Sequence, residues 1–289
     1  MTEIIQRDGT WTFDGETVRI VPGHDKSVNL LRRTLGELAV PLEALAGIAY
    51  EPGKKTGRLR LRLRDGADPL LQVTAGKLPD AADPYQLAVE ADRAGVAEYM
   101  VDEVRNAMLL EQVPSEPCTH YLMPGPSVPL TVSAGDGVVA FDGGRIRLDW
   151  TWKTDEVKQK AGPRVLTLDD LAAIEWTPAS GLENGCLRFI VSAASPKPPA
   201  KYDPHALVLF GFRKDPLTAL VAAAVAARMP HPAAPAVPET LTATADGVGS
   251  ADLHDELLRR LRELGELHRS GVLTEEEFTV AKQAVLKRF

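Results

Sequence analysis

The chain has 289 residues, of which 44% are hydrophobic and 25% are charged, enough apolar material for about two globular domains. Its formal net charge of -7 argues against sequence-independent nucleic-acid binding, which needs a basic surface, and disfavours attraction to anionic membranes. The two cysteines lack CxxC spacing, and no apolar run is long enough for a signal peptide or a membrane span. We therefore expect a reduced, cytoplasmic protein.

Three blocks of sequence occur twice and in the same order; the copies of the first block lie about 128 residues apart, and small insertions or deletions separate the blocks. Residues 9–20 recur at 137–148, residues 42–52 at 168–178, and residues 83–87 at 203–207. A period this long is far above that of solenoid repeats, so each copy should be a complete domain with its own core. The sequence therefore predicts two related domains, at residues 1–111 and 130–229.

The first copy is predicted to consist of short strands closed by one helix. Asp14-Gly15 lies between two strand-like runs and predicts a hairpin turn. Residues 58–64 alternate Arg and Leu, the pattern of a half-buried strand; it ends at Asp65-Gly66, and residues 70–73 are predicted to return as the next strand. Apolar residues from Val96 to Met108 then recur at helical spacing and predict the closing amphipathic helix.

A segment with five prolines, residues 112–129, is predicted to link the first copy to the second. The second copy repeats the plan, with a hairpin at Asp142-Gly143 and a final helix that begins at Asp215-Pro216. In that helix Asp215 is the expected cap and an apolar stripe from Leu217 to Val225 the expected buried face. A short linker and shared ancestry predict side-by-side packing of the copies with pseudo-twofold symmetry.

Residues 230–250 are rich in Pro, Ala and Thr and predict a flexible linker. Residues 251–289 follow as a separate unit of two amphipathic helices, the second opened by a capping box at 274–277. A unit below about 40 residues rarely folds alone, so we expect it to dock on the β-domains or, because its tether is loose, to self-associate. The apolar residues expected to mediate oligomerisation are Leu253, Leu257, Leu261, Leu264, Leu267, Leu273, Phe278, Val285 and Leu286.

Residues 261–278, with 281–286, resemble the bacterial short C-terminal domain called SHOCT, with Val285 in place of the more usual Leu. The resemblance implies an oligomerisation or partner-binding module without catalysis. The duplicated Phe-Asp-Gly and Leu-x-x-Leu-Ala-x-Ile blocks resemble an uncharacterised bacterial family with tandem pleckstrin-homology-like (PH-like) domains. That resemblance implies an α+β, mainly β fold: two tandem PH-like split β-barrels, each closed by a C-terminal helix, plus a C-terminal αα-hairpin.

The sharpest local feature is a basic stretch in the first copy, made of Lys54, Lys55, Arg58, Arg60, Arg62 and Arg64. Strand alternation places all four arginines on one face, where they could bind a phosphate-bearing or acidic ligand. The alternative is a solvated strand face, and we favour it because exposed charge on antiparallel sheets is common. The second copy has only Arg188 in the corresponding strand.

No catalytic constellation is visible in the sequence. The six histidines do not cluster at metal-ligand spacing, and no nucleophile, base and orienting group come together, so we expect no enzyme activity, metal or cofactor. The four tryptophans could stack a ligand, but we interpret them as core or sheet-edge residues. We expect a non-enzymatic scaffold that binds itself or another protein through its C-terminal hairpin. The alternative is a peripheral membrane or anionic-ligand binding protein that uses the basic stretch.

Overall fold

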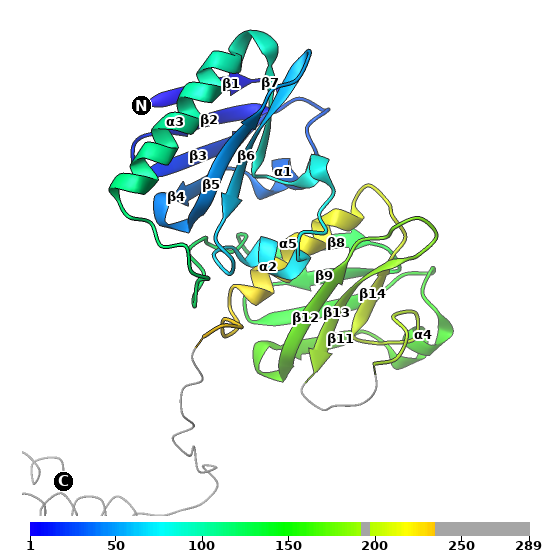
Figure 1. The fold of residues 1–289 in the computed structure, drawn as a ribbon. Helices are drawn as coiled ribbons and strands as arrows, with labels where there is room; N and C mark the ends of the chain where they lie inside the picture. The colour runs from blue at the N-terminus through cyan, green and yellow to red at the C-terminus, as the bar shows by residue number, and fades with distance from the viewer. Residues whose placement is uncertain (192–196, 235–289) are drawn as a thin grey trace, which may run out of the picture. The chain divides into compact units, whose positions relative to one another are not determined.

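The computed structural model describes residues 1–191 and 197–234 (Figure 1). The described chain is α+β and mainly β, with four small antiparallel sheets and few helices. None of its helices is both long and apolar enough to span a bilayer. The predicted C-terminal hairpin, with all of its apolar residues, lies outside the described residues, as does most of the predicted 230–250 linker.

The first copy contains a four-stranded sheet, a three-stranded sheet and a closing helix. The four-stranded sheet is β1 (Thr2–Gln6), β2 (Gly9–Phe13), β3 (Thr17–Pro22) and β4 (Leu38–Pro41), with the short helix α1 (Leu30–Leu35) between β3 and β4. The three-stranded sheet is β5 (Leu45–Glu51), β6 (Thr56–Leu63) and β7 (Gln86–Glu90). Helix α2 (Pro69–Thr74) lies between β6 and β7, α3 (Ala94–Leu110) closes the copy, and short 3₁₀ turns occupy η1 (Leu42–Ala44), η2 (Asp80–Ala82) and η3 (Ala91–Arg93).

The second copy repeats this plan within its described residues. Its four-stranded sheet is β8 (Leu130–Ala134), β9 (Gly137–Phe141), β10 (Arg145–Trp150) and β11 (Arg164–Thr167), with α4 (Glu156–Ala161) before β11. Its three-stranded sheet is β12 (Leu171–Thr177), β13 (Gly185–Val191) and β14 (Ala206–Leu209). The 3₁₀ turns η4 (Leu168–Asp170) and η5 (Asp215–Leu217) precede β12 and the closing helix α5 (Thr218–Ala226).

The local patterns that predicted strands and turns are confirmed at several points. In β6 the leucines are buried and the arginines exposed, as alternation requires. The two Asp-Gly hairpins are built alike: the Asp14 carboxylate accepts hydrogen bonds from the backbone N–H groups of Glu16 and Thr17, at 3.0 and 2.8 Å. Asp142 does the same for Gly144 and Arg145, and these backbone bonds hold the pKa of both carboxyls below its usual value.

Residues 70–73 do not form the predicted strand, because they belong to helix α2. The Asp68 side chain caps this helix by accepting from the backbone N–H groups of Leu70 and Leu71, at 3.0 and 3.3 Å, and Pro69 occupies the first turn. Strand β6 pairs instead with β7, where Thr56 faces Glu90. A run of four residues with three apolar side chains fits a strand or a helical turn equally well, and the Asp-Pro cap favours the helix.

The two copies meet through unlike elements: α2 of the first copy packs on α5 of the second (Figure 1). Leu31, Leu70 and Ala82 of the first copy belong to the apolar core of the second. The copies therefore pack side by side as expected, but the predicted pseudo-twofold symmetry is wrong. The predicted apolar stripe of α5 is also too narrow, because every residue from Thr218 to Ala226 is buried. Five of these nine residues are alanines, whose small side chains allow close packing against α2.

The proline-rich segment between the copies packs against the first copy. Cys118 and Met123 are buried in its core, and the backbone N–H of Cys118 donates to the carbonyl of Asp65 at 2.7 Å. The backbone N–H groups of Leu122 and Met123 both donate to the carbonyl of Ala67, at 2.9 Å. The loop after β6 and this segment therefore hold each other in place.

Candidate functional site

An open groove of about 650 Å³ lies between α3 and the sheet strand β5 in the first copy. Its walls are mostly apolar and include Ile48 from β5 and Met108, Leu109 and Val113 from α3 and the turn after it. Three arginines, Arg60, Arg62 and Arg105, complete the lining. An apolar hollow with a few convergent polar groups is the usual form of a binding site.

The groove forms because small residues lie beside long ones across β5 and β6. Gly47 pairs with Arg62 and Ala49 with Arg60, so two arginine side chains border positions that have almost no side chain of their own. Arg105 spans the hollow from α3, donating from Nε and Nη2 to the carbonyl oxygen of Ile48 at 3.2 and 3.0 Å. The helix is thereby tied to the strand while the space beside it stays open.

The structure does not bring the six predicted anion-binding residues together as one platform. Arg58 and Arg60 both approach Asp80, with nitrogen–oxygen distances of 3.1 and 4.0 Å. Arg64 donates to the backbone carbonyls of Glu43 and Glu116. Within residues 1–191 and 197–234, the side chain of Arg62 makes no ion pair or hydrogen bond, and neither do those of Lys54 and Lys55, which lie exposed in the turn before β6. Arg62 is therefore the arginine of this strand whose guanidinium is open to a ligand at the groove.

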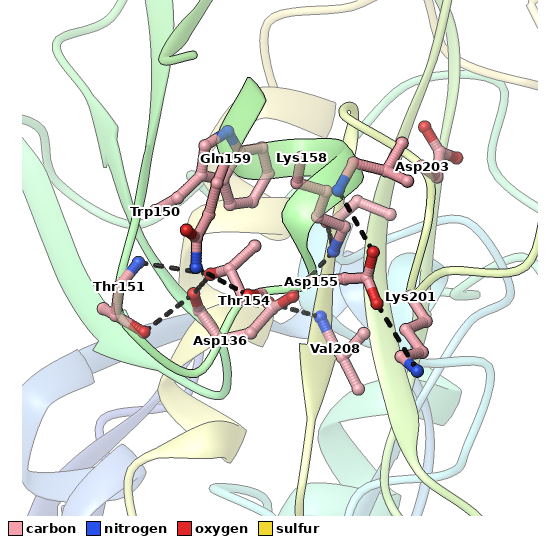
Figure 2. Close-up of polar contacts among 12 residues, drawn as sticks. Asp136, Trp150, Thr151, Thr154, Asp155, Lys158, Gln159, Lys201, Asp203 and Val208 are labelled. Carbon is pink, nitrogen blue, oxygen red and sulfur yellow. Dashed lines mark hydrogen bonds and ion pairs between the residues drawn. The ribbon is translucent and has the colours of Figure 1, made fainter. Parts of the chain in front are cut away.

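A buried charge pair that the sequence reasoning missed is present in the second copy (Figure 2). Lys158 of α4 is fully buried, and its Nζ donates to the Asp136 carboxylate at 2.7 Å and to the Ala206 carbonyl at 2.8 Å. Asp136 in turn accepts from the backbone N–H of Val208 at 2.8 Å. Burial lowers the pKa of Lys158, and the bond to Asp136 opposes that shift.

The first copy has the same arrangement with arginine in place of lysine. Arg32 of α1 donates from Nη1 to both Asp8 carboxylate oxygens, at 2.8 and 3.0 Å, and from Nη2 to the Gln86 carbonyl at 3.1 Å. The backbone N–H of Ala88 donates to Asp8 at 3.1 Å. In each copy the pair ties the first hairpin, the short helix and the last strand together, with its charges satisfied internally. We therefore assign it to the fold. The sequence did hold a signal for this pair: an Asp directly precedes the first repeated block in each copy, Asp8 before residues 9–20 and Asp136 before residues 137–148.

The tryptophans divide into two groups. Trp11 and Trp176 are buried, and Trp150 donates to the Gly162 carbonyl at 2.8 Å, so the expectation of core or sheet-edge positions is confirmed for these three. Trp152 is different, because 85% of its surface is exposed. Among the described residues, no group of three or more His, Cys, Asp or Glu side chains could hold a metal ion.

Comparison with known families identifies both parts of the chain. The model of the Domain of unknown function (DUF4429) matches residues 11–105 and 139–226, which are the two copies and more than half of the chain. The model of the Short C-terminal domain (SHOCT) matches residues 259–286. A comparison with curated proteins gave no match.

Proposed function

Because this chain belongs to the DUF4429 family, carries that domain in tandem and adds a SHOCT domain, we propose that it is a non-enzymatic, cytoplasmic interaction scaffold. Each tandem domain is proposed to be a PH-like split barrel. The support for this is a four-stranded and a three-stranded antiparallel sheet followed by one closing helix in each copy. Reduced cysteines fit the proposed compartment, since Cys118 and Cys186 are both free thiols.

The scaffold has two proposed working parts. The first is the SHOCT domain, whose apolar residues would bring several chains together. The second is the groove between α3 and β5, which would bind a segment of a partner protein. Linking several weak groove contacts through one assembly raises the overall affinity without any new contact.

The groove carries the proposal, because it combines apolar walls with the unengaged guanidinium of Arg62. An amphipathic partner segment would place apolar side chains against Ile48 and Met108 and a carboxylate against Arg62. Arginine suits this role because its planar guanidinium pairs with a carboxylate through two hydrogen bonds. A segment that carries only one of the two features would leave half of the groove unused.

Selection of displayed random peptides on the full-length protein tests this proposal. We expect enriched peptides to combine apolar residues with Asp or Glu, and Arg62→Glu to weaken a selected peptide about tenfold or more through lost pairing and like-charge repulsion. Arg93→Glu is the matched control, because Arg93 is exposed at the opposite end of α3. Peptides without acidic residues, or equal weakening by both variants, would contradict the groove as the binding site.

The alternative proposal, an anionic ligand on the basic stretch, has less support. Arg58 and Arg60 already face Asp80, and Arg64 is bonded to backbone carbonyls, so only Lys54, Lys55 and Arg62 are open to an anion. Sedimentation with anionic vesicles tests it, since Arg60→Glu/Arg62→Glu should then lose partitioning. Equal partitioning of this variant and the unaltered chain would exclude the alternative.

A further inference from the structure

Three loops of the second copy present large apolar side chains to solvent. Trp152, between β10 and α4, is 85% exposed; Leu182, between β12 and β13, is fully exposed; and Phe212, after β14, is 52% exposed. Side chains this large and apolar seldom stand free in several adjacent loops of a monomer, so we treat them together as an interaction surface.

The strand pairing places these loops at one end of the domain. Gly185 at the start of β13 pairs with Leu209 at the end of β14, so the β12–β13 turn lies beside the loop that carries Phe212. Lys153 joins that loop to the third, because its Nζ lies 4.8 Å from the Phe212 ring centre and 5.6 Å from that of Trp152. We call Trp152, Leu182 and Phe212 the apolar tip of the second copy.

Basic residues flank two members of the apolar tip: Lys153 follows Trp152, and Arg213 and Lys214 follow Phe212. Lys153, Arg213 and Lys214 are exposed, and none of them makes an ion pair with any other residue in the described parts of the chain. The adjacent Asp215 does not neutralise them, because it is buried and its carboxylate accepts backbone N–H groups from Gly135, Gly211 and Phe212, at 3.2, 2.8 and 3.0 Å. This role replaces the helix cap predicted for Asp215, and it fixes the loop that carries Phe212. Glu183 is the exposed acid beside Leu182 in its turn.

The corresponding loops of the first copy lack this combination. Between β3 and α1 the exposed residues include His24 and Lys26, and the β5–β6 turn carries Lys54 and Lys55. No large apolar side chain is exposed in either of these loops or in η3, the turn that follows β7, and all three segments are fully described. The apolar tip is therefore specific to the second copy and is not a requirement of the shared fold.

We propose that the apolar tip and the basic residues beside it dock the protein on an anionic phospholipid bilayer. Tryptophan favours the membrane–water interface, where its ring is at headgroup level, and apolar neighbours can enter the acyl boundary. Each nearby Lys or Arg strengthens binding to an anionic surface about fivefold. A single-stranded nucleic acid would also stack on aromatic rings, but it needs a continuous basic groove, whereas the basic residues here lie on separate loops. The bilayer fits separate apolar loop tips better.

Vesicle partitioning of the full-length protein tests the proposal. With mixed phosphatidylglycerol–phosphatidylcholine vesicles we expect co-sedimentation, a blue shift of tryptophan emission and quenching by brominated lipid, and much weaker binding to pure phosphatidylcholine. Trp152→Ala should reduce partitioning about tenfold or more and abolish the blue shift. Lys153→Ala/Lys214→Ala should reduce it about 25-fold, whereas Lys26→Ala, the same change in the corresponding loop of the first copy, should leave it unchanged. All four positions are exposed, and a thermal melt checks that the variants remain folded.

Three results would overturn the proposal. The first is no preference for phosphatidylglycerol vesicles, or equal partitioning of the unaltered chain and Trp152→Ala. The second is loss of vesicle binding in Arg60→Glu/Arg62→Glu but not in Trp152→Ala, which would assign the membrane contact to the first copy. The third is binding of an oligothymidine strand, but no vesicle, through Trp152. Arg62→Glu alone should weaken peptide binding at the groove and leave vesicle binding intact. A failed membrane proposal can therefore be told apart from a failed groove proposal.

Discussion

Asp68 links protonation to the contact between the two copies. It caps α2, the helix that packs on α5, and its carboxylate is buried and accepts hydrogen bonds from Leu70, Leu71 and the Tyr85 hydroxyl, the last at 2.9 Å. Burial raises its pKa to about 6, although these hydrogen bonds oppose the shift. The native state therefore holds a proton on Asp68 at a pH where the unfolded chain has released it.

The size and sign of the effect follow from the two pKa values. The unfolded value is 3.8 and the folded value about 6, a difference worth about 3 kcal/mol at 1.36 kcal/mol for each pKa unit. Below pH 3.8 the carboxyl is neutral in both states and its contribution to stability is fully present. As pH rises through about 6, the native state binds more protons than the unfolded state, so this contribution is lost.

Asp68→Asn removes the titration and keeps an acceptor for the helix cap. We expect the variant to gain up to about 3 kcal/mol in free energy of unfolding, relative to the unaltered protein, between about pH 4 and pH 7. Urea unfolding of both proteins at the two pH values measures the difference. Asp102→Asn, an exposed change on α3, is the control and should show a difference that does not vary with pH. A gap for Asp68→Asn that stays constant with pH within about 0.5 kcal/mol would refute the reasoning, since the linkage predicts a change of up to about 3 kcal/mol.

Two further predictions concern the core. Lys158→Ala should cost about 3–5 kcal/mol in urea unfolding, because Asp136 would be left buried without its partner, whereas Lys160→Ala on the exposed face of the same helix should cost about 0.5 kcal/mol or less. A loss below about 1 kcal/mol for Lys158→Ala would show that water replaces the lysine. Leu70→Ala at the α2–α5 contact should cost about 2–5 kcal/mol and lower the melting of both copies together in calorimetry. Two separated transitions, with only one shifted, would mean that the copies are energetically independent.

The sequence predicted those elements whose signal is local. Arg-Leu alternation over residues 58–64 located β6, and the Asp-Gly pairs at Asp14 and Asp142 located two hairpins, because one residue and its near neighbours supply all the interactions. The duplication predicted the shared plan of the two copies. Helix α2 could also have been predicted from the sequence, because Asp68-Pro69 carries the same helix-start signal as Asp215-Pro216, where a helix was expected.

Features that depend on distant segments were not predictable in this way. Helix α5 appeared amphipathic, because a single sequence does not reveal that α2, about 150 residues earlier, covers its second face. The charge pairs of Asp8 and Asp136 join positions 24 and 22 residues apart and use arginine in one copy and lysine in the other. The groove likewise depends on which arginines in and directly after β6 find partners, and those partners, Asp80 in η2 and Glu116 in the proline-rich segment, lie outside the sheets.

The proposed scaffold depends most on the assembly of several chains, and light scattering after size exclusion tests this most directly. The full chain should be multimeric at micromolar concentration, and a version that ends at Pro238, before the SHOCT domain, should be monomeric. A full chain that stays monomeric throughout that range would contradict assembly through the SHOCT domain.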